Sequence, residues 1–489
     1  MITFIICLLL LISAYFIYGR ILERVCGINP LSAVPSKTHF DGVDYIPMPM
    51  WKTFMIQLLN IAGLGPFFGA VLGAAYGPVA FVWITLGSIL IGSVHDFVAG
   101  VMSVKCGGVS LPEVVGKYLG RGTLNFMRGF SVVLMIIVGA VFMSQPAELI
   151  ASWLPKSTSE FSINGFGVTV LCVMGVILVY YIIATLFPVD KIIGRIYPIF
   201  GFALVAMALG ILGVLLFSGD YTIPEMSLKN HIANPDKFPI FPTLFLTIAC
   251  GAISGFHATQ SPIMARCLRN ERECRPVFYG AMISESIIAL IWAAIAMAFW
   301  GDVEGLNEAL AANRNNASVL VDMIANKTLG KWVAYLVMFG VVGAAITSGD
   351  TAYRSARLMI ADAFGVEQRT LWKRVVLCLP IFAGAVTLIL ATDFRTLWSY
   401  FAWFNQTLSV FTLWAICVFL VRRRKPVVIA MIPAVFMTYI CCCYLFTAGQ
   451  MLGLAPVLGN ILAGVLTLAI TVYFANQFRK EARNAKTSA

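Results

Sequence analysis

The chain has 489 residues, of which 60% are hydrophobic and only 12% are charged, with a mean hydropathy of +0.88. This composition is typical of a polytopic membrane protein and excludes an ordinary soluble enzyme. The net charge of +11 comes from basic residues in short loops between apolar segments, which indicates membrane topology rather than binding to nucleic acid.

Thirteen segments are each apolar over about the 20 residues that are needed to cross a bilayer. The first, residues 2–18, is preceded by no basic residue, so we expect a retained helix rather than a cleaved secretory signal. With the N-terminus outside, the predicted inside segments hold 27 of the 34 Lys and Arg residues, which predicts an inside C-terminus. The predicted spans lie near residues 2–18, 52–75, 77–103, 125–150, 164–186, 194–217, 241–262, 276–300, 329–350, 374–391, 395–421, 427–447 and 453–475.

The second span, 52–75, contains residues that argue against a continuous helix. Pro66 has no N–H and its ring clashes with the preceding turn, and Gly63 and Gly65 lower the cost of unwinding beside it. Unwound peptide groups persist at bilayer depth only where protein or a wet cavity satisfies them. We therefore expect a broken helix at a binding site.

The seventh span, 241–262, has two glycines of its own, Gly251 and Gly255, and ends in Pro262. Five helices separate the start of the second span from that of the seventh, so the two run in opposite directions, as in an inverted repeat. The alternative is that such glycines only let helices pack closely.

The predicted fold is thus all-α, with two five-helix repeats formed by spans 2–6 and 7–11. Spans 1, 12 and 13 are then peripheral. The corresponding boundaries are 1–51 for the first helix and an inside loop, 52–217 for the first repeat, 241–421 for the second repeat, and 427–489 for the last two helices and an inside tail.

Ionisable side chains inside membrane spans cost about 3 kcal/mol each on insertion scales and are functional candidates for that reason. Asp96 lies in a stripe of Gly and Ser where another helix can approach; it either takes up a proton during transport or pins the broken helix. His95 lies about 100° further round the helix, so we expect it to serve a different neighbour. His257 follows the glycines of the seventh span, among hydroxyl and amide side chains that can hydrogen-bond it.

Two further carboxylates belong to this set of candidates for proton coupling or structural polar contacts. Glu285 is flanked by serines in the eighth span and could face the core. Asp350 lies near the inner end of the ninth span, where Arg354 or Arg357 could pair with it.

The ninth span also offers adjacent hydroxyls at Thr347 and Ser348, which suit Na⁺ if they face unwound carbonyls of the second span. The alternative is that both hydroxyls bond their own backbone. The sequence has no catalytic motif for a protease, hydrolase or P-loop enzyme, and its 12 cysteines show no metal-like spacing. We expect no cofactor and no resident metal.

Four motifs in order resemble the carbon starvation protein A (CstA) family. They are N-I-A-G-L-G-P (60–66), S-V-H-D-F (93–97), S-G-F-H-A-T-Q-S-P (254–262) and S-G-D-T-A-Y-R-S-A-R (348–357). The resemblance covers most of the chain. It implies a LeuT-type carrier of the amino acid–polyamine–organocation superfamily, in a bacterial inner membrane, associated with peptide uptake and proton-coupled pyruvate uptake in starvation. It also implies a cation site formed by the carbonyls of Ala62 and Gly63 with Thr347 and Ser348.

We therefore expect a secondary active transporter that works by alternating access, with proton coupling favoured and Na⁺ second. A channel or a membrane-bound sensor of the same ligand is the alternative. The substrate, a small organic molecule, would bind between the breaks of spans 2 and 7, where the positive end of a half-helix can meet a carboxylate. The predicted binding residues are Asn60, Gly63, Gly65, Pro66, Ser254, Gly255, Phe256, His257 and Gln260. The sequence does not predict an oligomeric state.

Overall fold

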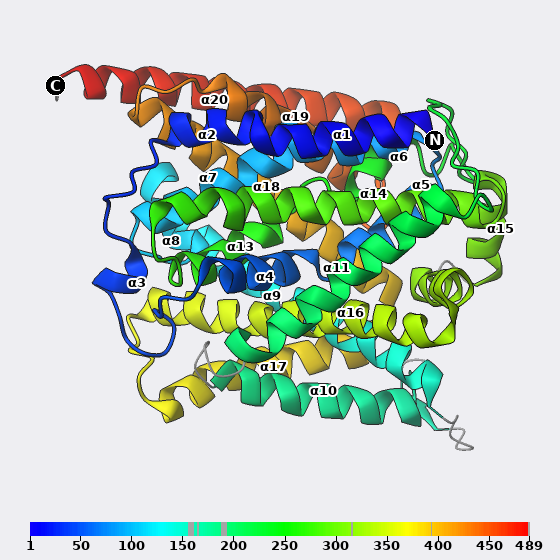
Figure 1. The fold of residues 1–489 in the computed structure, drawn as a ribbon. Coiled ribbons are helices and arrows are strands. Elements are labelled where there is room, and N and C mark those ends of the chain that lie inside the picture. Colours follow the sequence, from blue (N-terminus) through cyan, green and yellow to red (C-terminus); the bar gives the residue numbers. More distant parts are fainter. Residues whose placement is uncertain (155–160, 164–165, 187–192, 314–315, 393, 488–489) are drawn as a thin grey trace.

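The computed structural model describes residues 1–154, 161–163, 166–186, 193–313, 316–392 and 394–487. Nearly all of them are helical, and long helices run side by side between two opposite ends of one bundle (Figure 1). The N-terminus lies at the right-hand end in Figure 1 and the C-terminus at the left-hand end. We call these the N-terminal end and the C-terminal end of the bundle.

The elements of the first half follow the predicted spans closely. They are α1 (Ile2–Phe16), α2 (Tyr18–Cys26), α3 (Pro35–Thr38), α4 (Met50–Ala62), η1 (Gly65–Gly69), α5 (Ala70–Ala74), α6 (Val79–Val82), η2 (Trp83–Gly92), α7 (Ser93–Lys105), α8 (Leu111–Leu119), α9 (Arg121–Trp153), a hairpin of β1 (Ser162–Ile163) and β2 (Phe166–Gly167), α10 (Val168–Leu186) and α11 (Ile193–Phe217).

The second half starts with an interrupted helix and then consists of long ones. Its elements are η3 (Ile240–Leu244), α12 (Phe245–Thr247), α13 (Gly255–Ala265), η4 (Glu271–Glu273), η5 (Arg275–Gly280), α14 (Ala281–Phe299), α15 (Val303–Ala312), α16 (Ala317–Phe364), α17 (Leu371–Ala391), α18 (Phe394–Arg422), α19 (Val428–Thr447) and α20 (Pro456–Thr487).

Among the described residues, ten helices are long and apolar enough to cross a membrane, or eleven if the bent pair of α4 with η1 and α5 is one span. The count of thirteen predicted spans is therefore not reproduced by uninterrupted helices. One remaining span, 241–262, is divided among η3, α12 and α13. The other, 329–350, lies within α16, a 48-residue element that bends at Gly330 and continues past the predicted span.

The second span is broken where its sequence predicts a break. The helix α4 ends at Ala62, Gly63 adopts φ 47° and ψ −130°, and the continuation from Gly65 is bent by 53° relative to α4. Glycine alone adopts this backbone conformation without strain, and Pro66 follows at the start of a π-helical turn. We call Gly63–Leu64 the first break.

The seventh span is broken over a longer stretch. The chain leaves helical geometry at Ile248 and returns to it at Gly255, with Gly251 at φ 92°. We call residues 248–254 the second break. All of these residues are buried, which places non-helical backbone in the interior of the bundle, where protein can satisfy it.

Burial separates a central set of helices from a peripheral one. The apolar windows of η4–α14 and of α6–α7 are 83% and 78% buried, whereas those of α1–α2 and α20 are 28% and 22% buried. The breaks thus lie in the middle of the bundle, and the first and last spans pack on its outside, as Figure 1 shows for α1, α2 and α20.

Candidate functional site

The two breaks meet directly. A Cβ atom at Gly65 would lie 1.9 Å from the Cβ of Cys250, and one at Gly73 would lie 2.2 Å from the side chain of Ile248. Because these distances are far below any allowed contact, only glycine lets the two broken spans approach so closely. On the other side, a Cβ at Gly92 would lie 2.1 Å from the carbonyl oxygen of Ala252. The first broken span (η1 and α5) and η2 therefore hold the second break between them.

Side chains from two other elements satisfy the unwound backbone. Asn405 of α18 accepts hydrogen bonds from the Ser254 hydroxyl (3.0 Å) and from the Phe256 N–H (2.6 Å), so it caps the start of α13 from another helix. Gln406 donates to the carbonyl of Ile253 at 2.9 Å, and the indole of Trp83 donates to the carbonyl of Ile248 at 3.1 Å. The second break is thus fixed by polar contacts rather than left open.

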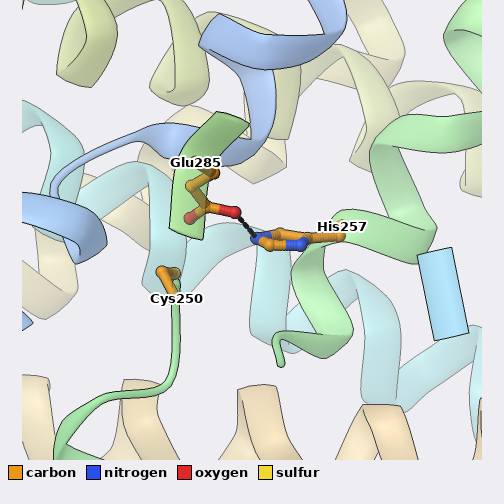
Figure 2. Close-up of side chains that lie close together, drawn as sticks. All are labelled: Cys250, His257 and Glu285. Carbon is orange, nitrogen blue, oxygen red and sulfur yellow. Dashed lines mark ion pairs between the residues drawn. The ribbon is translucent and has the colours of Figure 1, made fainter. Parts of the chain in front are cut away.

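A cluster of four buried ionisable side chains lies beside the second break. Asp96 contacts two imidazoles: its Oδ1 lies 2.7 Å from Nδ1 of His95, and its Oδ2 lies 2.8 Å from Nδ1 of His257. On the other side of the His257 ring, Nε2 lies 3.5 Å from Oε2 of Glu285, as Figure 2 shows. All four side chains are fully buried. We call His95, Asp96, His257 and Glu285 the Asp96 cluster.

The Asp96 cluster links three elements through one imidazole. His257 belongs to α13, Asp96 to α7 and Glu285 to α14, so the ring lies between two carboxyl groups from different helices. With Nδ1 of His257 donating to Asp96, Nε2 faces Glu285, whose two oxygens have no hydrogen-bond partner among the described residues. This arrangement places an imidazole and a carboxyl group, two groups that can exchange protons, 3.5 Å apart.

The expectation that His95 and Asp96 serve different neighbours is wrong. Their Cβ atoms do diverge on the helix, but the His95 ring turns back so that Nδ1 reaches the Asp96 carboxylate. The strong preference of a buried carboxylate for charged or polar partners outweighs the angular separation. The Nε2 atom of His95 has no partner among the described residues.

Cys250, His257 and Glu285 are the one set of side chains, in the part of the chain that the structure describes, whose geometry approaches a metal site. Their donor atoms lie within 4.8 Å of one another, and Figure 2 shows the three converging from the second break, α13 and α14. Donors that share a tetrahedral ion lie roughly 3.5 Å apart. These residues could therefore hold a metal ion only if they moved closer together.

The two predicted cation ligands of α16 face different ways. Ser348 donates across the helix interface to the carbonyls of Leu59 (2.9 Å) and Asn60 (3.1 Å), in the last turn of α4 before the first break. Thr347 instead donates to the carbonyl of Ala344 in its own helix at 3.0 Å. The structure thus brings Ser348 to two carbonyls of the last turn of α4, just before the first break, and does not bring Thr347 there.

Polar and aromatic side chains surround the two breaks. The amides of Gln57 and Asn60 are fully buried in α4, and none of their nitrogen and oxygen atoms has a partner among the described residues. The ring of Phe256 meets that of Phe142 edge to face, with centroids 6.0 Å apart, and Phe142 also lies over Gly63. Gln260 donates to the hydroxyl of Thr259, while its Oε1 is unpartnered within the described chain. Buried amides without partners are the groups that a polar ligand could satisfy.

Among the described residues, Asp350 forms no ion pair with Arg354 or Arg357. Its carboxylate accepts hydrogen bonds from the hydroxyls of Tyr197 (2.5 Å) and Thr185 (3.4 Å). Within the described residues, the carboxylate that contacts both Arg354 and Arg357 is Asp44, which lies in the loop before α4. Asp44 was not predicted, because a loop carboxylate far away in sequence gives no sign of being buried.

One cavity in the described part of the chain lies away from all of these residues. It has a volume of about 490 Å³ and opens between the ends of α9, α10 and α16, lined by Glu148, Thr169, Asn316 and Asp322 among others. None of its lining residues belongs to the breaks or to the Asp96 cluster. The residues of both breaks are buried.

The family model described as carbon starvation protein CstA matches residues 1–176 and 147–328, about two thirds of the chain. The chain belongs to the CstA family. The resemblance carried by the four sequence motifs is thereby confirmed.

Relatives of this CstA-family chain occur in several bacteria. A protein of Haemophilus influenzae, described as an uncharacterized membrane protein, is 43% identical over 64% of this chain and 95% of its own length. The peptide transporter CstA of Helicobacter pylori is 26% identical over 84% of this chain and 76% of its length. The pyruvate/proton symporter BtsT of Escherichia coli is 27% identical over 57% of this chain and 47% of its length.

Among solved structures, the fold of this CstA-family chain is similar to that of MhsT in complex with L-phenylalanine. The TM-score is 0.54, with 86% of this chain and 98% of that chain covered at 14% sequence identity. The predicted LeuT-type all-α membrane fold is thus confirmed. At this identity the likeness concerns the fold alone.

Three functional candidates of this CstA-family chain escaped the sequence analysis. Asn405 and Gln406 hold the second break, and their signal was available: two adjacent amides in an otherwise apolar span, F-N-Q-T, where a polar side chain needs a buried partner. Cys250 touches the first broken span, but a cysteine in an apolar segment carries no such signal.

Proposed function

We propose that this protein is a secondary active transporter, a proton-coupled symporter that imports pyruvate or short peptides. The observation that carries the proposal is the meeting of two interrupted helices beside the buried Asp96 cluster. Interrupted spans expose peptide groups to a solute at the bilayer midplane, and the cluster supplies groups that can exchange a proton. The names of the relatives, a peptide transporter and a pyruvate/proton symporter, support the same substrate classes.

In this proposal, substrate binds between the two breaks, and its carboxylate meets the positive N-terminal end of α13. Asn60, Gly63, Gly65 and Pro66 line one side, and Ser254, Gly255, Phe256, His257 and Gln260 line the other. Opening toward one face requires α4 or α13 to tilt away from its partners. Because His257 lies on α13 and Asp96 on α7, such a tilt changes the contact between them, and this couples proton uptake to the conformational change.

The second candidate coupling ion is Na⁺ at Ser348 and the carbonyls of α4. The contact of Ser348 with Leu59 and Asn60 favours it, since hydroxyl and carbonyl oxygens are ligands of hard cations. We rank it below the proton because Thr347 bonds its own backbone. We also propose an inner-membrane location, with the N-terminal end of the bundle outside and the C-terminal end in the cytoplasm, on the basis of the distribution of Lys and Arg.

The test is uptake of labelled pyruvate, and separately of di- and tripeptides, into proteoliposomes that hold the full-length protein, with imposed pH or Na⁺ gradients. We expect saturable uptake of one substrate class that a proton gradient drives above equilibrium. Flux that does not saturate and does not respond to either gradient would instead indicate a channel. Binding without flux would indicate a sensor.

A further inference from the structure

A buried pair of arginines lies at the C-terminal end of the bundle, away from the breaks. Arg354 and Arg357 belong to the last turns of α16, and both side chains are 0% exposed. We call them the inner arginine pair. The function proposed above does not use them, and burying a guanidinium is costly unless an anion accompanies it.

The anion is the carboxylate of Asp44, which is 2% exposed. Its Oδ1 lies 3.3 Å from Nη1 of Arg354, and its Oδ1 and Oδ2 each lie 3.4 Å from Nη2 of Arg357. Charge-assisted contacts between guanidinium and carboxylate are typically about 2.7–2.9 Å long. The contacts of Asp44 with the two arginines are therefore longer than is usual for such a pair.

Arg357 has binding capacity that Asp44 does not use. Only its Nη2 reaches the carboxylate, and its Nε and Nη1 have no hydrogen-bond partner among the described residues. A guanidinium is built to hold a carboxylate with two parallel N–H donors. A free carboxylate could adopt that geometry, whereas Asp44 is constrained by its own loop.

The loop that carries Asp44 is held in a defined conformation by hydrogen bonds. The Asp41 side chain accepts from the backbone N–H groups of Val43, Asp44 and Tyr45 at 2.8, 2.9 and 2.9 Å, which fixes the turn. Beyond it, the N–H of Met48 donates to the carbonyl of Cys267 at 2.9 Å. In Figure 1 this segment, between α3 and α4, runs along the C-terminal end of the bundle.

The loop is also continuous with the first broken span. After Met48 the chain enters α4 directly, and α4 ends at the first break. If a tilt of α4 that opens the C-terminal end carries this loop with it, Asp44 leaves the inner arginine pair. This would leave two buried guanidinium groups without their carboxylate as the substrate is released toward the same end.

We propose that the inner arginine pair is a transit site for the substrate's carboxylate, and that Asp44 is a carboxylate of the chain itself that occupies the site while this end is closed. The inference rests on the proposed function in two respects: the transported molecule carries a carboxylate, as pyruvate and peptides do, and a tilt of α4 opens the C-terminal end. The exchange of one carboxylate for another leaves the charge of the site unchanged, so neither state buries an unpaired arginine.

The first experiment is chemical rescue of Asp44→Ala in the purified full-length protein. We expect its thermal unfolding midpoint to lie below that of the wild type, and formate to raise it while formamide and an equal concentration of chloride do not. The wild type should not respond to formate, nor should Asp44→Ala combined with Arg357→Gln. An equal response to formate and formamide, or a response that persists in the variant with Arg357→Gln, would refute the carboxylate site. An equal response to chloride would show a general anion site instead of one for carboxylates. If Asp44→Ala does not fold, Asp44→Gly, which leaves the same space open, is tested with the same additions.

The second experiment uses the alkylation rate of Cys267 to detect displacement of Asp44 in the wild type. This thiol is fully buried, and its Sγ lies 4.0 Å from the Asp44 carbonyl. We expect pyruvate to raise the alkylation rate of Cys267 several-fold, measured by mass spectrometry of the peptide, and methyl pyruvate, which lacks the carboxylate, to leave it unchanged. Cys417, buried in α18, is the internal control. An unchanged rate at Cys267 under uptake conditions counts against the exchange.

The two experiments separate this inference from the proposed function. Rescue by formate without any uptake of pyruvate or peptides would support the carboxylate site and refute the proposed substrate. Uptake without rescue by formate, and without a change in the alkylation rate of Cys267, would support the proposed transporter and refute the carboxylate site.

Discussion

Gly65 and Cys250 are the point at which the two interrupted spans touch. The absence of a side chain at Gly65 lets the thiol-bearing carbon of Cys250 sit against the backbone of the first broken span. The contact joins residues that are far apart in sequence and in different halves of the chain. It makes the relative position of the two breaks sensitive to a single methyl group.

We predict that Gly65→Ala separates the breaks. The added Cβ would lie 1.9 Å from that of Cys250, so the backbone must shift, and overpacking of this kind costs about 1–3 kcal/mol. We expect a lower thermal unfolding midpoint and a loss of substrate uptake. Gly175→Ala, at an exposed position of α10 where a Cβ meets nothing within 4 Å, is the matched control and should change neither. Partial recovery on adding Cys250→Gly would assign the effect to this contact, and wild-type uptake by Gly65→Ala would refute it.

We predict that Asp96→Asn uncouples transport from the proton gradient. The substitution keeps the size of the side chain but removes the charge that faces both imidazoles. A hydrogen bond to a charged group contributes about 1.5–3 kcal/mol, which corresponds to roughly ten- to a hundredfold in rate. Uptake driven by a pH gradient should fall by that factor, whereas exchange of labelled for unlabelled substrate, which needs no net proton movement, should persist.

His257→Gln should show the same separation of uptake from exchange, because His257 is the link between Asp96 and Glu285. His39→Gln, at an exposed histidine, is the control for loss of an imidazole as such. If both cluster variants retain gradient-driven uptake, the Asp96 cluster has only a structural role.

The sequence was sufficient to predict the breaks because their causes are local. Pro66 cannot donate, and Gly63 and Gly251 adopt positive φ angles that other residues avoid. Both causes act within a few residues, so they can be recognised without knowing what packs against them. The inverted repeat followed from the spacing and opposed directions of two such spans, and the LeuT type from the resemblance that the four motifs carry.

The contacts within the candidate site could not be predicted in the same way. Asp96 and His257 are separated by 161 positions, and helical periodicity tells which face a residue occupies but not which helix lies opposite. The extension of α16 beyond 350 was missed for a related reason. Arg354 and Arg357 mark a membrane boundary by composition, yet both are buried because Asp44 arrives from a distant loop.

We predict that Asn405→Ala destabilises the start of α13. Its Oδ1 accepts from the N–H of Phe256 and from the Ser254 hydroxyl, and leaving a buried N–H unsatisfied costs about 1–3 kcal/mol. The thermal unfolding midpoint should fall accordingly. Asn405→Asp keeps an acceptor oxygen at this place and should be less destabilising than Asn405→Ala. Equal midpoints for the two variants would show that the cap contributes nothing.

We predict that Ser348→Ala impairs uptake more than Thr347→Ala does. Only Ser348 reaches the carbonyls of Leu59 and Asn60 beside the first break, whereas Thr347 bonds within its own helix. The adjacent residue is thus a matched control of similar chemistry and burial. If proton coupling is correct, uptake by both variants should remain independent of Na⁺. A strong Na⁺ dependence in the wild type that Ser348→Ala abolishes would instead establish the second coupling ion.

We predict that the contribution of Asp44 to stability depends on pH in the acid range only. Burial by itself would raise the pKa of Asp44, but Arg357 and Arg354 outweigh it, so the pKa lies below the ordinary value of 3.8. A carboxyl group whose pKa is lowered by folding stabilises the protein fully above the unfolded pKa and loses this effect as the pH falls through the folded one. Asp44→Asn should therefore lower the thermal unfolding midpoint at neutral pH, by an amount that stays constant down to about pH 4.

Below that pH the wild type and Asp44→Asn should converge, because protonation removes from the wild type the same charge that the substitution removes. The measurement is the difference in midpoint between the two proteins across the pH range, with Asp236→Asn, at an exposed aspartate, as the control. A difference that instead grows toward acid pH, or that already vanishes near neutrality, would mean that the inner arginine pair does not hold Asp44 in its ionised form.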